Sequence, residues 1–285
     1  MIYVNNEWLS ALEVLDQLTL SKNSHKTFKV CCDYKVSDKC RIEYDIQYRD
    51  FIKHTSNNNG NLPCIFCSRT MKFSGRNNPN TKYKSLNDNF FEKIDSQEKA
   101  YILGWIGSDG TIGKRGFTIA IQNSDEDILI KLKDIICSEI PIVNYINSTG
   151  TLMSSFDINS GKISKDLCKL FKINPGKKSD IVRLPQIDKK YFWSFIRGYF
   201  DGDGTINDLD KTCKKYLIAS IRSTSNFILN DFKKAIDIKS YLTVGHSISW
   251  ENKFAYSFLE EMYKDAIIWL PRKRNRFEKW KNKHE

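Results

Sequence analysis

Two aspartates occupy matching positions in a duplicated sequence pattern, and their chemistry suits a divalent cation. Residues 101–112 (YILGWIGSDGTI) resemble residues 195–206 (FIRGYFDGDGTI), and the repeat aligns Asp109 with Asp203. Two carboxylates that a fold holds close together repel each other and favour a bridging divalent cation. Hard oxygen ligands with open coordination positions suit Mg²⁺. The two aspartates are therefore the candidate metal-binding and catalytic residues.

The residues before each aspartate predict two helices that pack closely. Helical patterns cover 96–106 and 189–200, and small residues recur four positions apart in each, which places them on one helix face. Small residues on one face let another helix backbone approach closely. The predicted interface lies across a pseudo-two-fold axis and consists of Gly104, Ser108, Gly198 and Gly202. Pairing these helices brings the two aspartates together, with the backbone of Ser108 and Gly202 as further candidate ligands.

The repeated pattern has two other interpretations. A single Asp-Gly-Thr segment is an ordinary hairpin turn signal, but two copies after matching apolar helices argue against that alternative. A calcium-binding EF-hand loop starting at Asp201 is excluded, because its sixth and twelfth positions hold Ile206 and Thr212 instead of Gly and Glu.

The segments around each aspartate repeat in the same order. Each motif is followed by a β-rich run, a helical segment, two strand-like runs and a closing helix. In the second copy we expect the last strands at 241–250 and 253–259 and the closing helix at 260–270. Both halves then read helix, strand, strand, helix, strand, strand, helix. This pattern predicts an α+β fold with a duplicated αββαββα arrangement.

Cysteines in the first quarter of the chain form a second group with metal-ligand chemistry. Cys32, Cys40, Cys64 and Cys67 follow the spacing C-x7-C-x23-C-x2-C. This spacing predicts a structural four-thiolate Zn²⁺ site, with Cys31, His25 and His54 as substitutes for one ligand. Ordinary thiols are the main alternative, since a redox CxxC needs a βαβ context that is not apparent. Nearby basic residues would extend a nucleic-acid footprint: Arg41, Arg49, Lys53, Arg69, Lys72 and Arg76.

Composition narrows the partners and the domain plan. The chain of 285 residues has 45 Lys and Arg against 34 Asp and Glu, a net charge of +11, so its expected partner is a polyanion. With 40% hydrophobic residues it buries a core and is not disordered. We expect no membrane span and no signal peptide, a short helix over residues 7–20, and a location inside the cell. The predicted divisions are a module at 1–75, a linker at 76–94, and two halves at 95–188 and 189–285.

The duplicated motif resembles the LAGLIDADG motif of homing endonucleases in their single-chain, two-motif form, over 102–110 and 196–204. The resemblance implies that the eighth motif position, Asp109 or Asp203, binds the catalytic metal. It implies that the sixth position, Gly107 or Asp201, packs rather than catalyses. It also implies curved antiparallel sheets that form a saddle on double-stranded DNA, in a protein that acts as a monomer.

The resemblance extends to further residues and to the reaction. It implies one basic residue after each closing helix, Lys178 (or Lys177) and Lys273, near the metals. The predicted DNA-contacting residues are Thr118, Gln122, Arg222, Ser247, Ser249, Arg272 and Arg274. The implied activity is that of a site-specific endonuclease that needs Mg²⁺, with Mn²⁺ as a substitute. It would cut both strands of a long pseudo-palindromic site and leave short 3′ overhangs.

Alternatives within the same resemblance stay open. An intron maturase would bind intron RNA without cutting, and a regulator would bind DNA on the same saddle without catalysis. Both aspartates are retained, which favours the nuclease. A complete intein is not expected, because the chain opens with Met1 and lacks a terminal His-Asn. The expected setting is a mobile element in the cytoplasm or nucleus of an AT-rich host, in an organelle or in a virus.

Overall fold

The computed structural model describes most of the chain, and its residues separate into two compact units. The described residues are 2–4, 7–9, 24–35, 37, 39–57, 61–73, 83–176, 180–211, 214–243 and 246–284. The units are Met1–Lys84 and Ser85–Glu285. The first unit therefore extends past residue 75, and the second begins inside the stretch that the sequence assigned to a linker.

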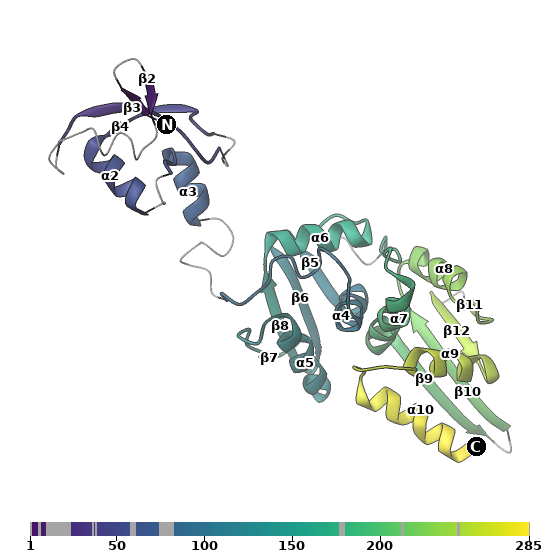
Figure 1. Ribbon diagram of the computed structural model, residues 1–285. Helices are drawn as coiled ribbons and strands as arrows, with labels where there is room; N and C mark the ends of the chain where they lie inside the picture. The colour runs from purple at the N-terminus through teal and green to yellow at the C-terminus, as the bar shows by residue number, and fades with distance from the viewer. Residues whose placement is uncertain are drawn as a thin grey trace. The chain divides into compact units, whose positions relative to one another are not determined.

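In its described residues, the N-terminal unit has one sheet and two helices (Figure 1). Its strands are β1 (Ile2–Val4), β2 (Glu7–Leu9), β3 (Thr27–Cys31) and β4 (Glu43–Gln47), in the order β2-β1-β3-β4. All its strand pairs are antiparallel. The helices are α2 (Tyr48–Asn57) and α3 (Ile65–Phe73).

The expected helix over residues 7–20 is wrong at its start. Glu7–Leu9 form β2, which pairs with β1 so that Tyr3 lies opposite Trp8. Pairing with a neighbouring strand satisfies backbone groups that a helix would have satisfied internally. Residues 10–20 lie outside the described part of the chain.

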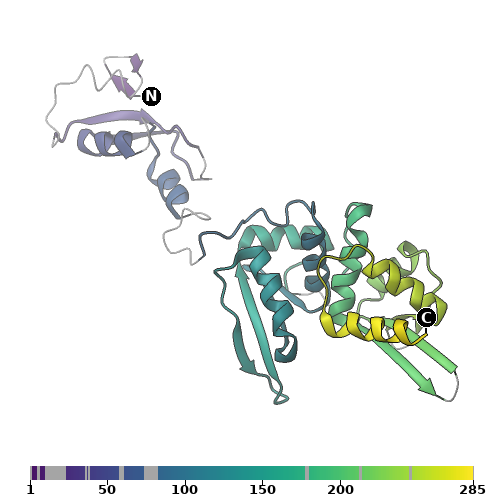
Figure 2. The same ribbon diagram turned by 60° about the horizontal axis from the view of Figure 1, so that its bottom comes forward.

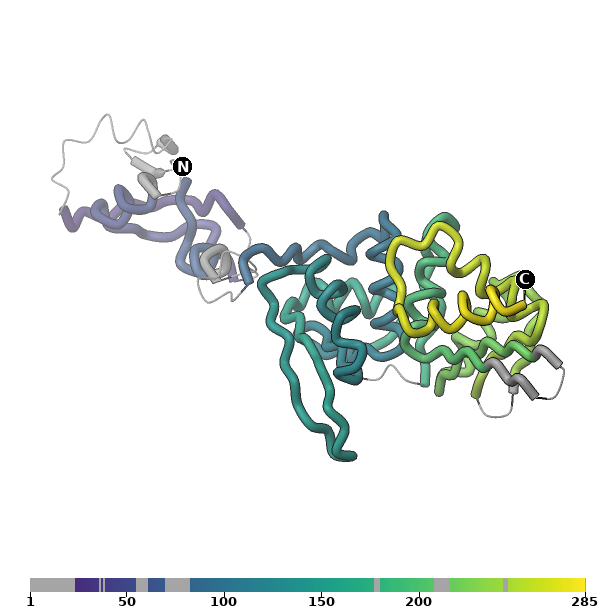
Figure 3. Tube along the Cα trace, turned by 90° about the horizontal axis from the view of Figure 1, so that it is seen from below, coloured from purple at the N-terminus to yellow at the C-terminus, as the bar shows by residue number. Residues whose placement is uncertain are grey.

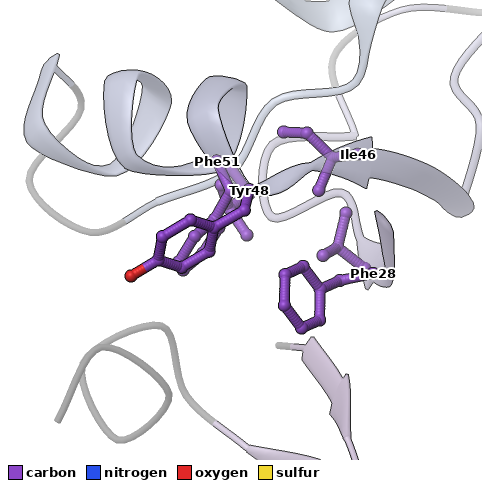
Figure 4. Packing of buried hydrophobic residues seen from close by; sticks show 6 residues of the cluster. Phe28, Ile46, Tyr48 and Phe51 are labelled. Carbon is purple, nitrogen blue, oxygen red and sulfur yellow. The ribbon is translucent and has the colours of Figure 1, made fainter. Parts of the chain in front are cut away.

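The described residues of this unit form an apolar cluster between β3, β4 and α2. Figure 4 shows its members from β3, β4 and α2 pointing toward one another, with the rings of Phe28, Tyr48 and Phe51 in mutual contact. Val30, Ile46 and Leu62 complete the buried cluster. A unit of 84 residues buries a smaller fraction of its surface than a large domain does, so a stabilising link such as a metal site would add to its stability.

The second unit consists of two halves with the same topology. The first half contains α4 (Gln97–Ser108), β5 (Gly110–Gly113), β6 (Gly116–Gln122), a 3₁₀ turn η2 (Asn123–Asp125), α5 (Glu126–Cys137), β7 (Val143–Ile146), β8 (Leu152–Asn159) and α6 (Gly161–Phe171). Its sheet has the order β5-β6-β8-β7, with every pair antiparallel. Figure 3 shows the β7–β8 hairpin projecting from this half.

The second half repeats this arrangement. It contains α7 (Lys189–Asp203), β9 (Gly204–Lys211), β10 (Lys214–Arg222), α8 (Asn226–Ala235), β11 (Tyr241–Thr243), β12 (Ser247–Glu251) and α9 (Lys253–Tyr263). Its sheet order is β11-β12-β10-β9, the same pattern as in the first half. β9 and β10 form the long antiparallel pair in Figure 2. The mixed α+β fold with antiparallel sheets is thus confirmed.

Two sequence expectations for the second half were wrong in position. Both last strands, β11 and β12, lie before Asn252, and the closing helix expected at 260–270 is α9, which begins at Lys253 and ends at Tyr263. Residues 253–259 form the start of α9 rather than a strand. Asn252 has a positive φ of 52°, which ends the strand, and the buried residues Ala255, Phe258, Leu259 and Met262 follow a helical period. The basic tail forms a further helix, α10 (Pro271–His284), which buries Lys273 and Phe277. Among the described residues, no helix is long and apolar enough to cross a membrane.

Candidate metal and nucleic-acid site

Helices α4 and α7 lie side by side between the two sheets, with almost no space between their backbones (Figure 1). A Cβ atom on Gly104 would lie 2.6 Å from the backbone nitrogen of Tyr199, and one on Gly198 would lie 2.8 Å from the carbonyl carbon of Tyr101. Real Cβ atoms do not approach backbone this closely. These two glycines therefore permit the pairing that brings the ends of both helices together.

Gly198→Ala is expected to destabilise the second unit by about 3 kcal/mol, because the added methyl group meets backbone and not a movable side chain. Thermal unfolding measures the effect. Gly161→Ala is the matched control, since Gly161 lies in the first turn of α6 and a Cβ atom added to it would have nothing within 4 Å. An unchanged unfolding temperature for Gly198→Ala would contradict the close approach.

The two candidate metal-binding aspartates lie at corresponding helix ends. Asp109 caps α4, with its backbone N–H donating to the carbonyl oxygen of Trp105 at 2.9 Å, and Asp203 is the last residue of α7. A Cβ atom on Gly202 would lie 2.6 Å from Oδ2 of Asp109. The Asp109 carboxylate therefore lies against the residue that directly precedes Asp203.

The buried phenol of Tyr199 lies within the electrostatic influence of both carboxylates. The hydroxyl of Tyr199 donates a hydrogen bond to Oγ of Ser223 at 3.0 Å. Burial raises the pKa of Tyr199, and the negative charges of Asp203 and Asp109 raise it further. Electrostatic effects of this kind need short distances. The fold thus brings together the two aspartates that the sequence repeat aligned.

Lys273 lies beneath the end of α7. Its side chain is buried, and its Nζ donates to three successive backbone carbonyl oxygens, those of Phe200 at 2.6 Å, Asp201 at 2.7 Å and Gly202 at 3.2 Å. Burial lowers the pKa of Lys273 to about 8, against the opposing influence of Asp201, Asp109 and Asp203. The ammonium group thus caps the helix end that carries Asp203. It also occupies the Gly202 carbonyl oxygen that the sequence suggested as a metal ligand.

The sixth motif position of the second copy is a packing residue in this structure. Asp201 is fully buried, and its Oδ2 accepts hydrogen bonds from the hydroxyl of Tyr101 at 2.6 Å and from the backbone N–H of Leu270 at 2.8 Å. Burial raises its pKa to about 6. Since Tyr101 belongs to α4, this bond ties the two halves together. It is a link that the sequence did not predict.

Arg197 is a second buried polar residue that the sequence did not identify. Its guanidinium group donates to the carbonyl oxygens of Ile268 and Met262, both at 2.8 Å, and to Oγ of Ser194 at 3.3 Å. The sequence signal that could have identified it is an arginine among the apolar residues of the predicted helix at 189–200. The bonds fix the segment that leads from α9 into α10, and hence the position of Lys273.

Arg272 connects the start of α10 to the first half. Its Nε lies 2.9 Å from both carboxylate oxygens of Asp125, and its Nη2 lies 2.9 Å from Oδ2. Arg274 pairs with Glu278 at 3.5 Å and stacks on Trp269, 4.0 Å from the ring centre. The sequence assigned both arginines to DNA, whereas in this structure their guanidinium groups have partners within the protein.

The other predicted DNA-contacting residues lie on the sheets. Thr118 and Gln122 alternate with buried Phe117, Ile119 and Ile121 along β6, and the Thr118 hydroxyl donates to Asp157. Arg222 ends β10 as an exposed residue. Ser249 is partly exposed on β12. Ser247 is only 9% exposed and lies opposite Arg222 in the register of β10 and β12. Lys177 and Lys178 lie outside the described residues.

Four cysteine sulfurs meet in the N-terminal unit. The Sγ atoms of Cys32, Cys40, Cys64 and Cys67 all lie within 4.8 Å of one another, and those of Cys40 and Cys64 are 3.9 Å apart. A tetrahedral Zn²⁺ with Zn–S bonds of about 2.3 Å separates its sulfurs by about 3.8 Å. In the described part of the chain, the predicted substitute ligands Cys31, His25 and His54 are not members of this group.

Backbone hydrogen bonds surround the sulfurs and favour thiolates. The N–H of Cys64 donates to Sγ of Cys32 at 3.3 Å, and the N–H of Cys67 donates to Sγ of Cys64 at 3.5 Å. Although burial opposes ionisation, such bonds lower the pKa of Cys32 to about 6 and also lower that of Cys64. Burial and the neighbouring cysteines raise the pKa of Cys40 to about 12. The donor set can therefore hold a metal ion, since a cation relieves the mutual repulsion of clustered thiolates.

Comparison with known proteins gives one family match and several structural matches. No curated protein matches the sequence. The chain is similar to the meganuclease I-SmaMI bound to an uncleaveable DNA, with 13% identity and a TM-score of 0.43, over 66% of this chain and 90% of that chain. It is similar to the homing endonuclease I-WcaI bound to its DNA recognition sequence, with 13% identity and a TM-score of 0.43, over 70% of this chain and 93% of that chain. It is also similar to full-length DUF199/WhiA from Thermatoga maritima, with 15% identity and a TM-score of 0.41, over 70% of this chain and 66% of that chain. Residues 193–262, which lie in the second half, match the LAGLIDADG-like domain family.

Proposed function

We propose that the protein is a site-specific endonuclease that cuts both strands of DNA with the help of divalent metal ions. The observation that carries the proposal is the meeting of Asp109 and Asp203 at the paired ends of α4 and α7, on either side of the axis that relates the two halves. Two equivalent carboxylates at a two-fold axis match the two equivalent scissile phosphates of a duplex. The match of residues 193–262 to the LAGLIDADG-like domain supports the same conclusion.

The donor set at this site suits Mg²⁺. Asp109 and Asp203 are the residues that would hold it, because carboxylate oxygens are hard ligands and two nearby negative charges favour a cation between them. Bound metal would polarise the phosphate, activate a water molecule and neutralise the leaving oxygen. The protein contributes the position of both carboxylates through the close approach of α4 and α7. Burial also keeps the Tyr199 phenol un-ionised.

The exposed polar faces of the two sheets are the proposed DNA-binding surface. Along β6, side chains alternate between the core and the open face, so Thr118 and Gln122 share the open side. Arg222 and Ser249 occupy the corresponding sheet in the second half. Hydroxyl, amide and guanidinium groups read base edges and bind phosphates. The target would be a long pseudo-palindromic site, because the two halves are related but not identical.

Lys273 acts in this proposal as a positioning residue for Asp203. Lys273→Met is expected to lower stability by about 3 kcal/mol, since three carbonyl oxygens at a helix end lose a charged donor. Cleavage of the strand served by Asp203 should fall more than cleavage of the other strand, which strand-specific labelling measures. Lys281→Met on the same helix is the control, because the ion pair of Lys281 with Glu260 is partly exposed and such pairs contribute little to stability. If cleavage of both strands fell equally, Lys273 would have a structural role only and would not position Asp203.

We also propose that the cysteine cluster holds one structural Zn²⁺. Four sulfurs within 4.8 Å of one another, three of them on buried cysteines, and N–H groups that donate to two of these sulfurs support this assignment. Because Cys64 directly precedes α3 and Cys67 lies within it, the ion would join this helix to the segments that carry Cys32 and Cys40. A metal ion that joins these segments would stabilise a unit of this size.

A cleavage selection tests the proposed function directly. The purified full chain is incubated with a randomised duplex DNA library and Mg²⁺, and the cut ends are sequenced. We expect one preferred site, staggered cuts with short 3′ overhangs, and no products when EDTA replaces Mg²⁺. Specific binding without cutting would instead identify a non-catalytic DNA-binding protein. Preferential binding of structured intron RNA would identify a maturase.

A further inference from the structure

The N-terminal unit contains a groove that the proposed cleavage chemistry does not use. The groove has a volume of about 720 Å³ and lies between β4, α2 and α3. Three arginines line it, Arg41 before β4, Arg49 on α2 and Arg69 on α3, and all three are exposed. A groove bordered by guanidinium groups from three separate elements is suited to bind an extended anion.

The sulfur cluster fixes the wall of the groove that α3 provides. Cys64 precedes this helix and Cys67 lies in its first turn, and both are fully buried on its inner face. Ile65, Ser68 and Arg69 lie three and four positions apart and share the outer face, which lines the groove. Arg69 therefore lies on a helix whose opposite face is packed into the unit through buried Cys67.

Charge favours a polyanion in spite of two acids in the groove. Asp45 and Asp50 also line it, with Oδ2 of Asp50 3.9 Å from Nε of Arg49. Asp45 lies opposite Lys29 in the sheet register. The N-terminal unit has 13 lysines and arginines against eight acids, so 84 of the 285 residues carry +5 of the net charge of +11. The positive charge of the chain is thus denser here than in the second unit.

We propose that this groove binds the phosphate backbone of double-stranded DNA, as a second contact next to the site that the second unit would cut. Guanidinium groups bind phosphates bidentately, and an exposed helix face fits the major groove of a duplex. The proposal rests on the proposed function only in placing both contacts on the same DNA molecule. A second contact within one chain raises overall affinity through effective concentration, without any change at the cleavage site.

The test compares two full-length variants that lose the same charge. R41A/R49A/R69A removes the groove arginines, and K26A/K29A/K39A removes three exposed lysines of the same unit that do not line the groove. Binding to a labelled duplex is measured from 50 to 300 mM salt. Since each lost phosphate contact changes the slope of log K against log salt by about 0.9, the groove variant should lose about 2 to 3 from the slope. Its affinity near 150 mM salt should fall about tenfold or more.

Two further measurements separate charge from folding and from partner identity. R41K/R49K/R69K should keep most of the slope, and the zinc content of every variant should equal that of the wild type. Equal slopes for the groove variant and the lysine control overturn the proposal, as does a loss confined to an RNA duplex used as a second probe. Failure to cut DNA would refute the proposed function but would not change these binding slopes, so the two outcomes are distinguishable.

Discussion

Asp109→Asn and Asp203→Asn are each expected to abolish double-strand cleavage, with a loss of about 10³-fold or more. The amide lacks the negative charge and the second ligand oxygen that hold a divalent cation, and metal assistance in phosphodiester hydrolysis is worth several kcal/mol of transition-state stabilisation. The measurement is the rate of double-strand break formation at saturating protein, on the site recovered by selection. DNA binding should persist or tighten, because each change removes a negative charge beside the DNA.

The pairing of the two aspartates allows a sharper expectation. Because each carboxylate ends the helix of a different half, each variant should nick one strand faster than the other, and the two variants should prefer opposite strands. Glu261→Gln is the control, since Glu261 is an exposed acid on α9. Cleavage of both strands at the wild-type rate by either aspartate variant would refute the assignment of the site.

Removal of zinc is expected to unfold the N-terminal unit and to leave the second unit folded. Apparent binding energies of structural Zn²⁺ sites are about 10–16 kcal/mol, as large as the whole unfolding free energy of a small domain, about 5–15 kcal/mol. Cys64→Ser should therefore purify without zinc and should lose one of two calorimetric transitions. Metal analysis of the wild type should give one Zn²⁺ per chain, and Co²⁺ substitution should give the charge-transfer absorption of thiolate ligands.

Cys31→Ser is the matched control for the zinc site. Cys31 lies next to Cys32 in the sequence, but it is not a member of the sulfur group that the structure brings together. Its replacement should leave the zinc content and both transitions unchanged. Zinc at full stoichiometry in Cys64→Ser, or its absence from the wild type, would show that the cluster is an ordinary group of thiols.

The order of elements in the second unit could be predicted because its signals are local. Small residues at helical spacing, alternating strands and Asp-Gly exits recur in both copies, so one copy checks the other. The predicted element boundaries were wrong where one stretch of sequence fits both a strand pattern and a helix pattern. Residues 253–259 hold apolar residues that suit a strand or a helix, and the positive φ of Asn252 decided for the helix.

The sequence by itself determined the duplication, the two aspartates at equivalent positions and the cysteines with metal-ligand spacing. These features depend on residue type and on separations along the chain. The tertiary structure alone decided where Lys273, Arg272 and Asp201 point. Arg272 meets Asp125 and Asp201 meets Tyr101 across 147 and 100 residues of chain, and Lys273 caps the end of α7. Such contacts arise from packing between elements, so no local pattern distinguishes a buried capping lysine from one that contacts DNA.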